Sequence, residues 1–501
     1  MRFALIAGVI VVLVIATLAL ASGALSAIVR KRAVNGLKDT FGADLQFKNL
    51  TVALFPRIVV TAEDVVFRQE DRPEFPPLIT IRKLTASTNP LNALRKHVGL
   101  VTVEGLQLHV PPRRGQTPPA QRGAGSGTRS AFAIDEVIAD GTALTIIPKD
   151  SAKEPLEFEI SRLRLNGAGP SSAMSFHADL RNARPPGDIH SDGSFGPWVK
   201  EEPGDTPVSG TYTFRNADLS VFKGIAGTLS SDGKYSGVLQ YITADGTTDT
   251  PDFSVKISGN PVDLKTRFHA IVDGTNGDTL LQPVDAQFGH SELLARGGVE
   301  QLHGTKGKTV SLDVTATHAR VEDLLRLGAS GKAMMSGLAD FHTKLVVPPG
   351  PESIEQKLKL DGAFDVGSAQ FKELNVQEKV NKLSHSGQGD PTEDPDATVA
   401  SDFAGRFTLD RGVMTFQSLS FTVPGVGVSL SGKYGVADGS LDFQGTARLD
   451  AKLSQATTGI KSFLLKAVNP LFERHKAGAV LPIKITGTRD APSFGLNLRP
   501  K

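Results

Sequence analysis

The chain has 501 residues, of which 22% are charged and 40% hydrophobic, and its formal net charge is +2. This near-balance argues against a nucleic-acid-binding protein, which needs a clustered excess of Lys and Arg. There is no cysteine, so the chain forms no disulfide and has no thiolate site. The 51 Gly and 30 Pro indicate many turns, and 26 Phe against 4 Tyr and 1 Trp favour buried apolar surface over aromatic membrane belts.

The amino terminus contains an uncharged run over residues 3–29, followed by Arg30-Lys31-Arg32. A helix needs roughly 20 apolar residues to cross a membrane, so residues 1–29 are predicted to form a retained transmembrane anchor. The alternative is a cleaved signal peptide, with Ala19-Leu20-Ala21 before the cleavage site. Basic residues after the run outnumber Arg2, and this charge bias alone would keep the rest of the chain in the cytoplasm.

Residues 30–112 are predicted to form a first module. A short basic helix over residues 33–41 comes first, and strands interrupted by a turn at Phe55-Pro56 and a short helix at Pro90-Leu91-Asn92 follow. Residues 113–130 are rich in Pro, Gly and Arg, which predicts a linker or a long loop. A Pro-rich ligand or a contact with anionic lipid is the functional alternative for this segment.

Residues 131–350 are predicted to form a repetitive β-sheet region. The segment that begins Asn216-Ala217-Asp218-Leu219 returns in diverged form as His318-Ala319-Arg320-Val321. Repeats of this kind bury their apolar surface against their neighbours in a stack.

Residues 351–501 contain the clearest strand pattern. Apolar and polar residues alternate over residues 402–449 between turns such as Asp410-Arg411-Gly412 and Pro424-Gly425. This period of two predicts antiparallel strands with one apolar and one polar face. We also expect a helix over residues 372–384, an acidic loop over residues 389–396, a basic amphipathic helix over residues 458–476 and a last strand pair. The alternation alone does not distinguish stacked sandwiches from a curled sheet with an open apolar groove.

These elements resemble the AsmA family of bacterial envelope proteins, which is related to bridge-like lipid transfer proteins with a chorein-type amino-terminal module. The carboxy-terminal order of helix, acidic loop, hairpins, basic helix and strand pair is similar to the carboxy-terminal domain of that family. The matching amino-terminal segments are Leu54-Phe55-Pro56, Glu63-Asp64-Val65, residues 78–84, Pro90-Leu91 and residues 104–108.

The resemblance implies a mostly β fold: a transmembrane helix, then a long, curled antiparallel sheet with a few short helices. It also implies a single-pass protein of the bacterial inner membrane with its body in the periplasm, against the charge bias. The family's lipid-carrying groove would here be lined by Phe364, Val366, Phe371, Phe407, Leu409, Met414, Phe416, Leu419, Phe421, Val423, Val428, Leu430, Leu441 and Phe443.

The function that the resemblance implies is passive conduction of phospholipids between the inner and outer membranes, in support of outer-membrane biogenesis. Some 20 to 25 strands at about 4.8 Å each would give a trough of roughly 100 to 120 Å. Phospholipids, the inner membrane and envelope proteins are the expected partners. The alternative is an envelope scaffold or assembly factor for outer-membrane proteins that conducts no lipid.

No motif indicates catalysis, a cofactor or a metal. The eleven histidines show no His-Glu-x-x-His or paired spacing. Residues 304–309 imitate a phosphate-binding loop, but Leu302 replaces its first glycine. Residues 273–278 are rich in Asp and Asn, yet they lack the bidentate glutamate of a calcium loop and are expected to form a plain turn. We therefore expect a protein that is not an enzyme.

Overall fold

The computed structural model describes most of the chain between residues 43 and 497. The predicted anchor, the helix over residues 33–41, the linker 113–130, the acidic loop 389–396 and the helix 458–476 lie outside the described residues. Within the described residues, every helix is too short or too polar to span a bilayer. The described ranges are 43–53, 56–69, 74–94, 97–110, 133–147, 155–168, 173–197, 199, 203–274, 276–302, 305, 307–328, 333–372, 374–388, 399–450, 480–489 and 491–497.

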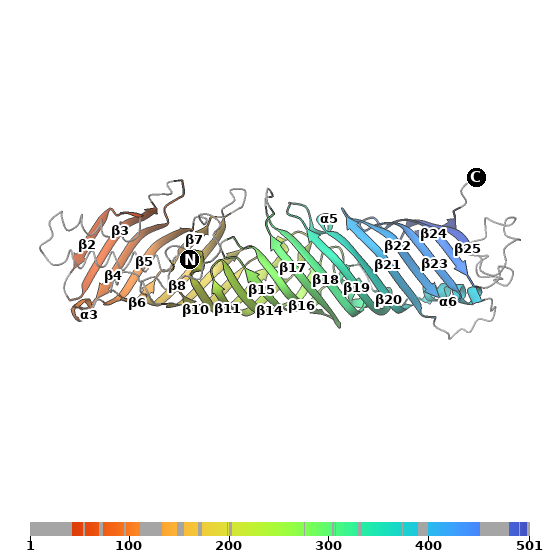
Figure 1. Ribbon diagram of the computed structural model, residues 1–501, viewed down its shortest axis with the longest axis horizontal. Coiled ribbons are helices and arrows are strands. Elements are labelled where there is room, and N and C mark those ends of the chain that lie inside the picture. Colours follow the sequence, from red (N-terminus) through yellow and green to blue (C-terminus); the bar gives the residue numbers. More distant parts are fainter. Residues whose placement is uncertain are drawn as a thin grey trace.

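The described residues form one elongated sheet of 26 strands, in which strands follow one another along the long axis nearly in chain order (Figure 1). A mostly β fold is therefore confirmed. The first strands are β1 (Ala43–Gln46), β2 (Asn49–Ala53), β3 (Ile58–Gln69), β4 (Ile79–Thr88), β5 (His97–Val110), β6 (Ala133–Ile138), β7 (Thr142–Ile146), β8 (Leu156–Ala168), β9 (Met174–Ala183) and β10 (Pro186–Phe195).

The middle and end of the sheet continue without interruption past residue 350. The middle strands are β11 (Pro207–Asp218), β12 (Ile225–Ala226), β13 (Thr228–Val238), β14 (Tyr241–Val255), β15 (Val262–Val272), β16 (Thr279–Phe288), β17 (Ser291–Glu300), β18 (Thr309–Arg320) and β19 (Met335–Val347). The last strands are β20 (Lys359–Phe371), β21 (Ser401–Asp410), β22 (Val413–Val423), β23 (Val426–Gly435), β24 (Ser440–Leu449), β25 (Val480–Thr488) and β26 (Ala491–Leu496).

The expected antiparallel pairing holds along the sheet except at β5. This strand pairs in parallel with both β6 and β7, which lie end to end between β5 and β8. Parallel neighbours need a connection of a dozen residues or more, and the chain between Val110 and Ala133 provides that length. The sheet is therefore mixed, and the prediction of a wholly antiparallel sheet was wrong at this point.

Short helices accompany the sheet. The helix predicted at Pro90 is present as α3 (Pro90–Leu94), and the helix predicted over residues 372–384 is present as α6, shifted toward the carboxy terminus. The described helices are α3, α4 (Val321–Gly328), α5 (Ile354–Lys357), α6 (Leu374–Gln388) and the 3₁₀ turns η1 (Pro203–Asp205) and η2 (Leu219–Val221).

The predicted repeat between residues 216 and 318 corresponds to the same local structure. Asn216 and His318 both have positive φ, and each is followed by a fully buried alanine and then by a helical segment, η2 or α4. Ser368 repeats this arrangement before α6. At all three positions the ladder shifts register, so a β-bulge turns the strand end toward its helix.

Burial is uneven along the sheet. A single large cluster of buried side chains spans β3 to β10, and Leu84, Leu106 and Leu163 within it are fully buried. Two smaller clusters lie near the carboxy-terminal end, where α6 contributes Val380 and α4 contributes Val321. The amino-terminal end is therefore packed as an ordinary core, whereas the rest of the sheet is only locally covered.

Close backbone approach explains one glycine of the carboxy-terminal sheet. A Cβ atom on Gly432 would lie 2.2 Å from the carbonyl oxygen of Asp442, whereas a Cβ on Gly427 of the same strand meets nothing within 4 Å. We predict that Gly432→Ala lowers the thermal unfolding midpoint, with a cost of about 1–3 kcal/mol from the forced backbone shift. Gly427→Ala is the matched control and should leave the midpoint near that of the wild type. Equal midpoints for the two variants would contradict this account of the packing.

Candidate apolar lipid-binding face

The fourteen residues expected to line a groove all lie on one face of five consecutive strands. We call this the apolar face, and its opposite the polar face. The strands contribute Phe364, Val366 and Phe371 (β20), Phe407 and Leu409 (β21), Met414, Phe416, Leu419, Phe421 and Val423 (β22), Val428 and Leu430 (β23), and Leu441 and Phe443 (β24).

A β-bulge keeps this face continuous through β22. Met414 and Phe416 are even-numbered, while Leu419 and Phe421 are odd-numbered, so a regular strand would point them to opposite sides. Phe407 pairs with Phe416, and the preceding Arg406 pairs with Ser418, which leaves Gln417 as an extra residue. This one insertion restores all five apolar side chains of β22 to the same face.

Aromatic rings form two rows across the strands of the apolar face. Phe371, Phe403 and Phe421 make one row, with ring centroids 6.0 and 4.9 Å apart. The second row links Phe364 to Phe407 at 6.1 Å, then continues through Phe416 at 6.4 Å to Phe443 at 5.7 Å. Tilted rings at these distances are in favourable contact.

Glycines leave room for these rings. Gly405 pairs with Phe364, and a Cβ atom on Gly405 would lie 2.9 Å from Cε1 of that ring. Gly432 lies between Phe416 and Phe443 in the ladder, so the two rings approach each other across its missing side chain. The missing side chains of Gly405 and Gly432 therefore leave space that neighbouring rings of the aromatic rows occupy.

Most of this surface is only half-buried. Of the fourteen residues, Val366, Leu409, Val423 and Phe443 are buried, at 3–7% exposure, and the other ten are half-buried. Leu106 and Leu163 in the amino-terminal cluster are fully buried by contrast. The apolar face of β20–β24 is thus still accessible to a small molecule, whereas that of β4–β9 is not.

The apolar face continues through the middle of the sheet. The ladders connect Phe364 to Phe341 on β19, and further pairings lead to half-buried apolar residues on β15 to β18. These residues are Leu264, Phe268, Leu281, Val284, Leu293 and Leu312. The open part of this face therefore extends well beyond the strands with the clearest sequence pattern.

Polar groups on the apolar face near β11 and β13 bond to one another. The hydroxyl groups of Tyr235 and Ser191 lie 2.8 Å apart, and those of Tyr212 and Ser231 lie 3.0 Å apart. Burial raises the pKa of both tyrosines above the usual value, so they are neutral at physiological pH. Because these neutral hydroxyl groups are already hydrogen-bonded to one another, covering this polar belt of Tyr and Ser side chains with an apolar ligand costs little free energy.

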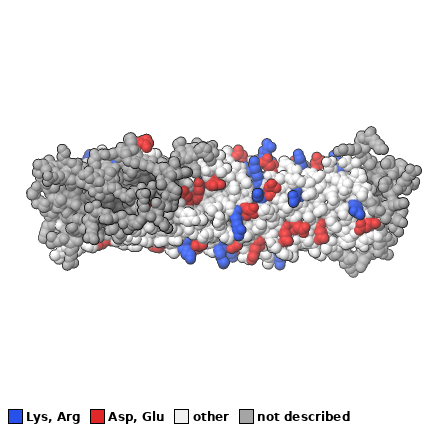
Figure 2. All heavy atoms as spheres, viewed as in Figure 1, with Lys and Arg blue, Asp and Glu red and all other residues white. Residues whose placement is uncertain are grey.

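The polar face carries charges of both signs. Figure 2 shows Lys and Arg interspersed with Asp and Glu over the middle of the molecule. Several form pairs across neighbouring strands, such as Arg215 with Asp232 at 2.5 Å and His342 with Asp313 at 2.7 Å. These side chains are about half exposed, so each pair contributes little stability, but together they keep this side of the sheet in water.

Sequence reasoning omitted several members of the apolar face. Phe403 contacts the rings of both Phe371 and Phe421, and Tyr434 pairs with Met414 and Leu441. Both could have been found, because Phe403 has the same parity as Phe407 on β21 and Tyr434 has the same parity as Leu430 on β23. Phe341 was harder to find, because the pattern of β19 is interrupted by small and polar residues.

The Asp- and Asn-rich segment at residues 273–278 forms a turn, as expected. The Asn276 side-chain amide donates to Asp273, and the backbone N–H of Asp278 donates to the Asn276 side chain at 2.7 Å. The Lys308 ammonium group lies 3.4 Å from the Asp278 carboxylate. These contacts account for the polar side chains of the turn that the structure describes.

No protein-family model, curated protein or solved structure matches the chain.

The difference in burial along the sheet predicts a difference in chemical accessibility. The chain has no native cysteine, so a single introduced cysteine reports the accessibility of its own position alone. We predict that Leu430→Cys, on the half-buried part, reacts with N-ethylmaleimide at least about tenfold faster than Leu106→Cys, which is protected by the closed core. Both variants should react alike in denaturant. Equal protection in the native chain would mean that the apolar face of β23 is as closed as that of β5.

Proposed function

We propose that the chain is a periplasmic protein, anchored in the bacterial inner membrane, that binds phospholipids and conducts them passively between the two membranes to support outer-membrane biogenesis. The observation that carries this proposal is the half-buried aromatic surface of β20–β24. The resemblance to AsmA-like proteins supplies the cellular setting, with residues 1–29 as the anchor.

The physical argument begins with the free energy of the exposed surface. Apolar area left in water costs about 25 cal/mol per Å², so a long half-exposed apolar face favours a ligand that covers it. Acyl chains gain about 0.8 kcal/mol for each CH₂ group that they bury. A row of similar Phe rings accepts an acyl chain in many positions, which suits binding without a fixed site.

The open face is long enough for several lipids. From β11 to β25 the strands span about 60 Å at about 4.8 Å each. A bilayer core of about 30 Å contains two acyl layers, so one acyl chain is about 15 Å long. Lipids in single file along this face would keep their headgroups in water at its margin. The closed core over β3–β10 implies that lipids enter or leave near β10 and β11, well after the anchor.

Movement along this face needs no energy source within the chain. The aromatic rows consist of Phe side chains, and the hydroxyls of Tyr212 and Tyr235 are already bonded to serine side chains. Adjacent lipid positions are therefore nearly equal in free energy. Lipid supply at one end and removal at the other would set the direction.

Cross-linking in living cells tests lipid contact directly. Benzoylphenylalanine is placed at Leu419, on the apolar face, or at the adjacent Ser418, which is exposed on the polar face. In a bacterium grown with radioactive phosphate, we expect light to attach labelled lipid at position 419 and not at position 418. Protein adducts at 419 without labelled lipid would favour the alternative, an envelope assembly scaffold.

A charge on the apolar face should stop conduction. We predict that Leu419→Glu abolishes complementation of an outer-membrane permeability defect in a strain that lacks the chain, because a carboxylate among the Phe rings is costly to desolvate. Ser418→Glu adds the same charge to the same strand and should complement fully. Levels of folded protein, checked by limited proteolysis, must match. Full activity of Leu419→Glu at wild-type levels would argue against lipid passage over β22.

A further inference from the structure

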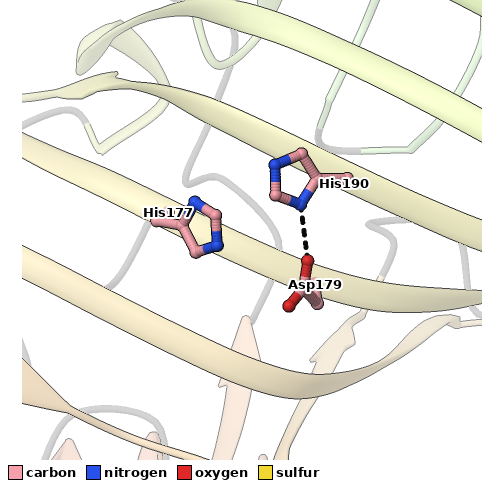
Figure 3. A group of neighbouring side chains, drawn as sticks. All are labelled: His177, Asp179 and His190. Carbon is pink, nitrogen blue, oxygen red and sulfur yellow. Dashed lines mark hydrogen bonds and ion pairs between the residues drawn. The ribbon is translucent and has the colours of Figure 1, made fainter.

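Four ionisable side chains gather on the polar face where the closed core ends. His177 and Asp179 lie two residues apart on β9, and His190 and Asp192 lie two residues apart on β10, so each pair shares one face. The antiparallel register places His177 opposite Asp192 and Asp179 opposite His190. The cluster is thus a square of two imidazoles and two carboxylates, and Figure 3 shows three of its members side by side.

The side chains contact one another closely. His190 Nδ1 lies 2.5 Å from Asp179 Oδ1, and His177 Nδ1 lies 2.7 Å from Asp192 Oδ1. The other nitrogen of His190, Nε2, lies 3.1 Å from Asp192 Oδ2. The two imidazole rings meet edge to face with centroids 4.6 Å apart. His177, Asp179 and His190 therefore converge on one small volume, and Asp192 bonds to both imidazoles.

This donor set matches a transition-metal site. Imidazole nitrogens and carboxylate oxygens bind Zn²⁺ at about 2.0–2.2 Å, usually as four ligands in a tetrahedron. Such bond lengths put neighbouring ligand atoms about 3.3 Å apart. One ligand atom from each of His177, Asp179 and His190 already lies within 4.8 Å of the others. The side chains are 30–56% exposed, so small rotations can open their hydrogen bonds to admit an ion.

Simple His–Asp pairs elsewhere on the polar face show what distinguishes this cluster. His269 with Asp245, and His342 with Asp313, are pairs at 2.7 Å that contain a single imidazole. An isolated cross-strand pair is sufficiently explained by attraction between opposite charges. In the β9–β10 cluster two such pairs lie with their rings in contact, so two imidazoles and a carboxylate offer ligand atoms at one place on the sheet.

We propose that His177, Asp179 and His190 form a Zn²⁺ site that joins β9 to β10 at the end of the closed core, with Asp192 as the hydrogen-bonded neighbour of both imidazoles. Arg162 on β8 lies 3.3 Å from Asp179 Oδ2 and balances its charge, which leaves Oδ1 directed at His190. Sequence reasoning missed this set because His177 and His190 are brought together only by strand register.

Zinc binding by the full-length, untagged chain tests the proposal. The chain is extracted in detergent, freed of metal by dialysis against a chelator, and titrated with Zn²⁺ in competition with a fluorescent zinc indicator. Hydrogen bonding to Asp179 raises the pKa of His190, so a proton competes with the metal and the titration is made at pH 8. We expect one strong site per chain, with at least about tenfold weaker binding for His177→Gln or His190→Gln.

Matched controls separate this site from general surface binding. His269→Gln removes an imidazole from a similar His–Asp pair and should leave the strong site unchanged. The thermal midpoint should rise with Zn²⁺ for the wild type and for His269→Gln, but not for His190→Gln. If a histidine variant fails to fold, Asp179→Asn provides the same test at the third ligand.

Cobalt provides a spectroscopic readout of the geometry. Co²⁺ in a four-ligand site absorbs visible light far more strongly than hexahydrated Co²⁺, so the wild type should develop this absorption and His190→Gln should not. Wild-type Zn²⁺ affinity equal to that of the His177→Gln/His190→Gln double variant would overturn the proposal. The same conclusion would follow if His269→Gln weakened binding as much as His190→Gln.

Discussion

A sheet with one apolar face and one polar face must remove the apolar face from water, and the structure depends on how it does so. At about 25 cal/mol per Å², the free energy at stake along 26 strands exceeds any contribution from the scattered ion pairs of the polar face. Over β3–β10 the apolar side chains pack into one closed cluster. From β11 onward many of them are half-buried, and among the described helices α4 and α6 pack against parts of this face. The main division of the molecule is therefore this change in side-chain burial between β10 and β11.

Continuity of the apolar face depends on small irregularities. Strand bulges at Gln417 and near Ser368 would look like defects in a regular ladder, yet without them the side chains beyond each bulge would point into water. Glycines such as Gly405 have the complementary role, because they let a neighbouring ring lie across the strand. The bulge residues and the glycines together keep the apolar side chains of these strands on one continuous surface.

Much of this architecture could be predicted from the period of two in the sequence. Within a stretch without bulges it placed residues such as Phe407 and Leu409 on one face, because side-chain direction in a regular strand depends on position alone. The period would put Phe416 and Leu419 on opposite faces, and only the bulge at Gln417 brings them together. The same pattern could not reveal that Leu106 is fully buried while Leu430 is half-buried. Burial depends on what lies over a strand, and that involves segments distant in the sequence.

Strand pairing was less predictable than side-chain direction. The parallel pairing of β5 depends on the route of a connection whose sequence has no periodic pattern. The cluster of His177 and His190 depends on the register between β9 and β10. A register shift of one residue would separate the four groups onto opposite faces while leaving the sequence motif of each strand unchanged.

The two faces of β9 and β10 connect the proposed metal site with the proposed lipid path. His177 points to the polar face, while the next residue, Ala178, is buried in the last part of the closed core. Ser191 lies between His190 and Asp192 and bonds to Tyr235 on the apolar face. A metal bound to His177, Asp179 and His190 would therefore fix the spacing of β9 and β10 directly behind the first polar belt of the open face. In this arrangement the ion would hold the mouth of the lipid path to one width without touching a lipid.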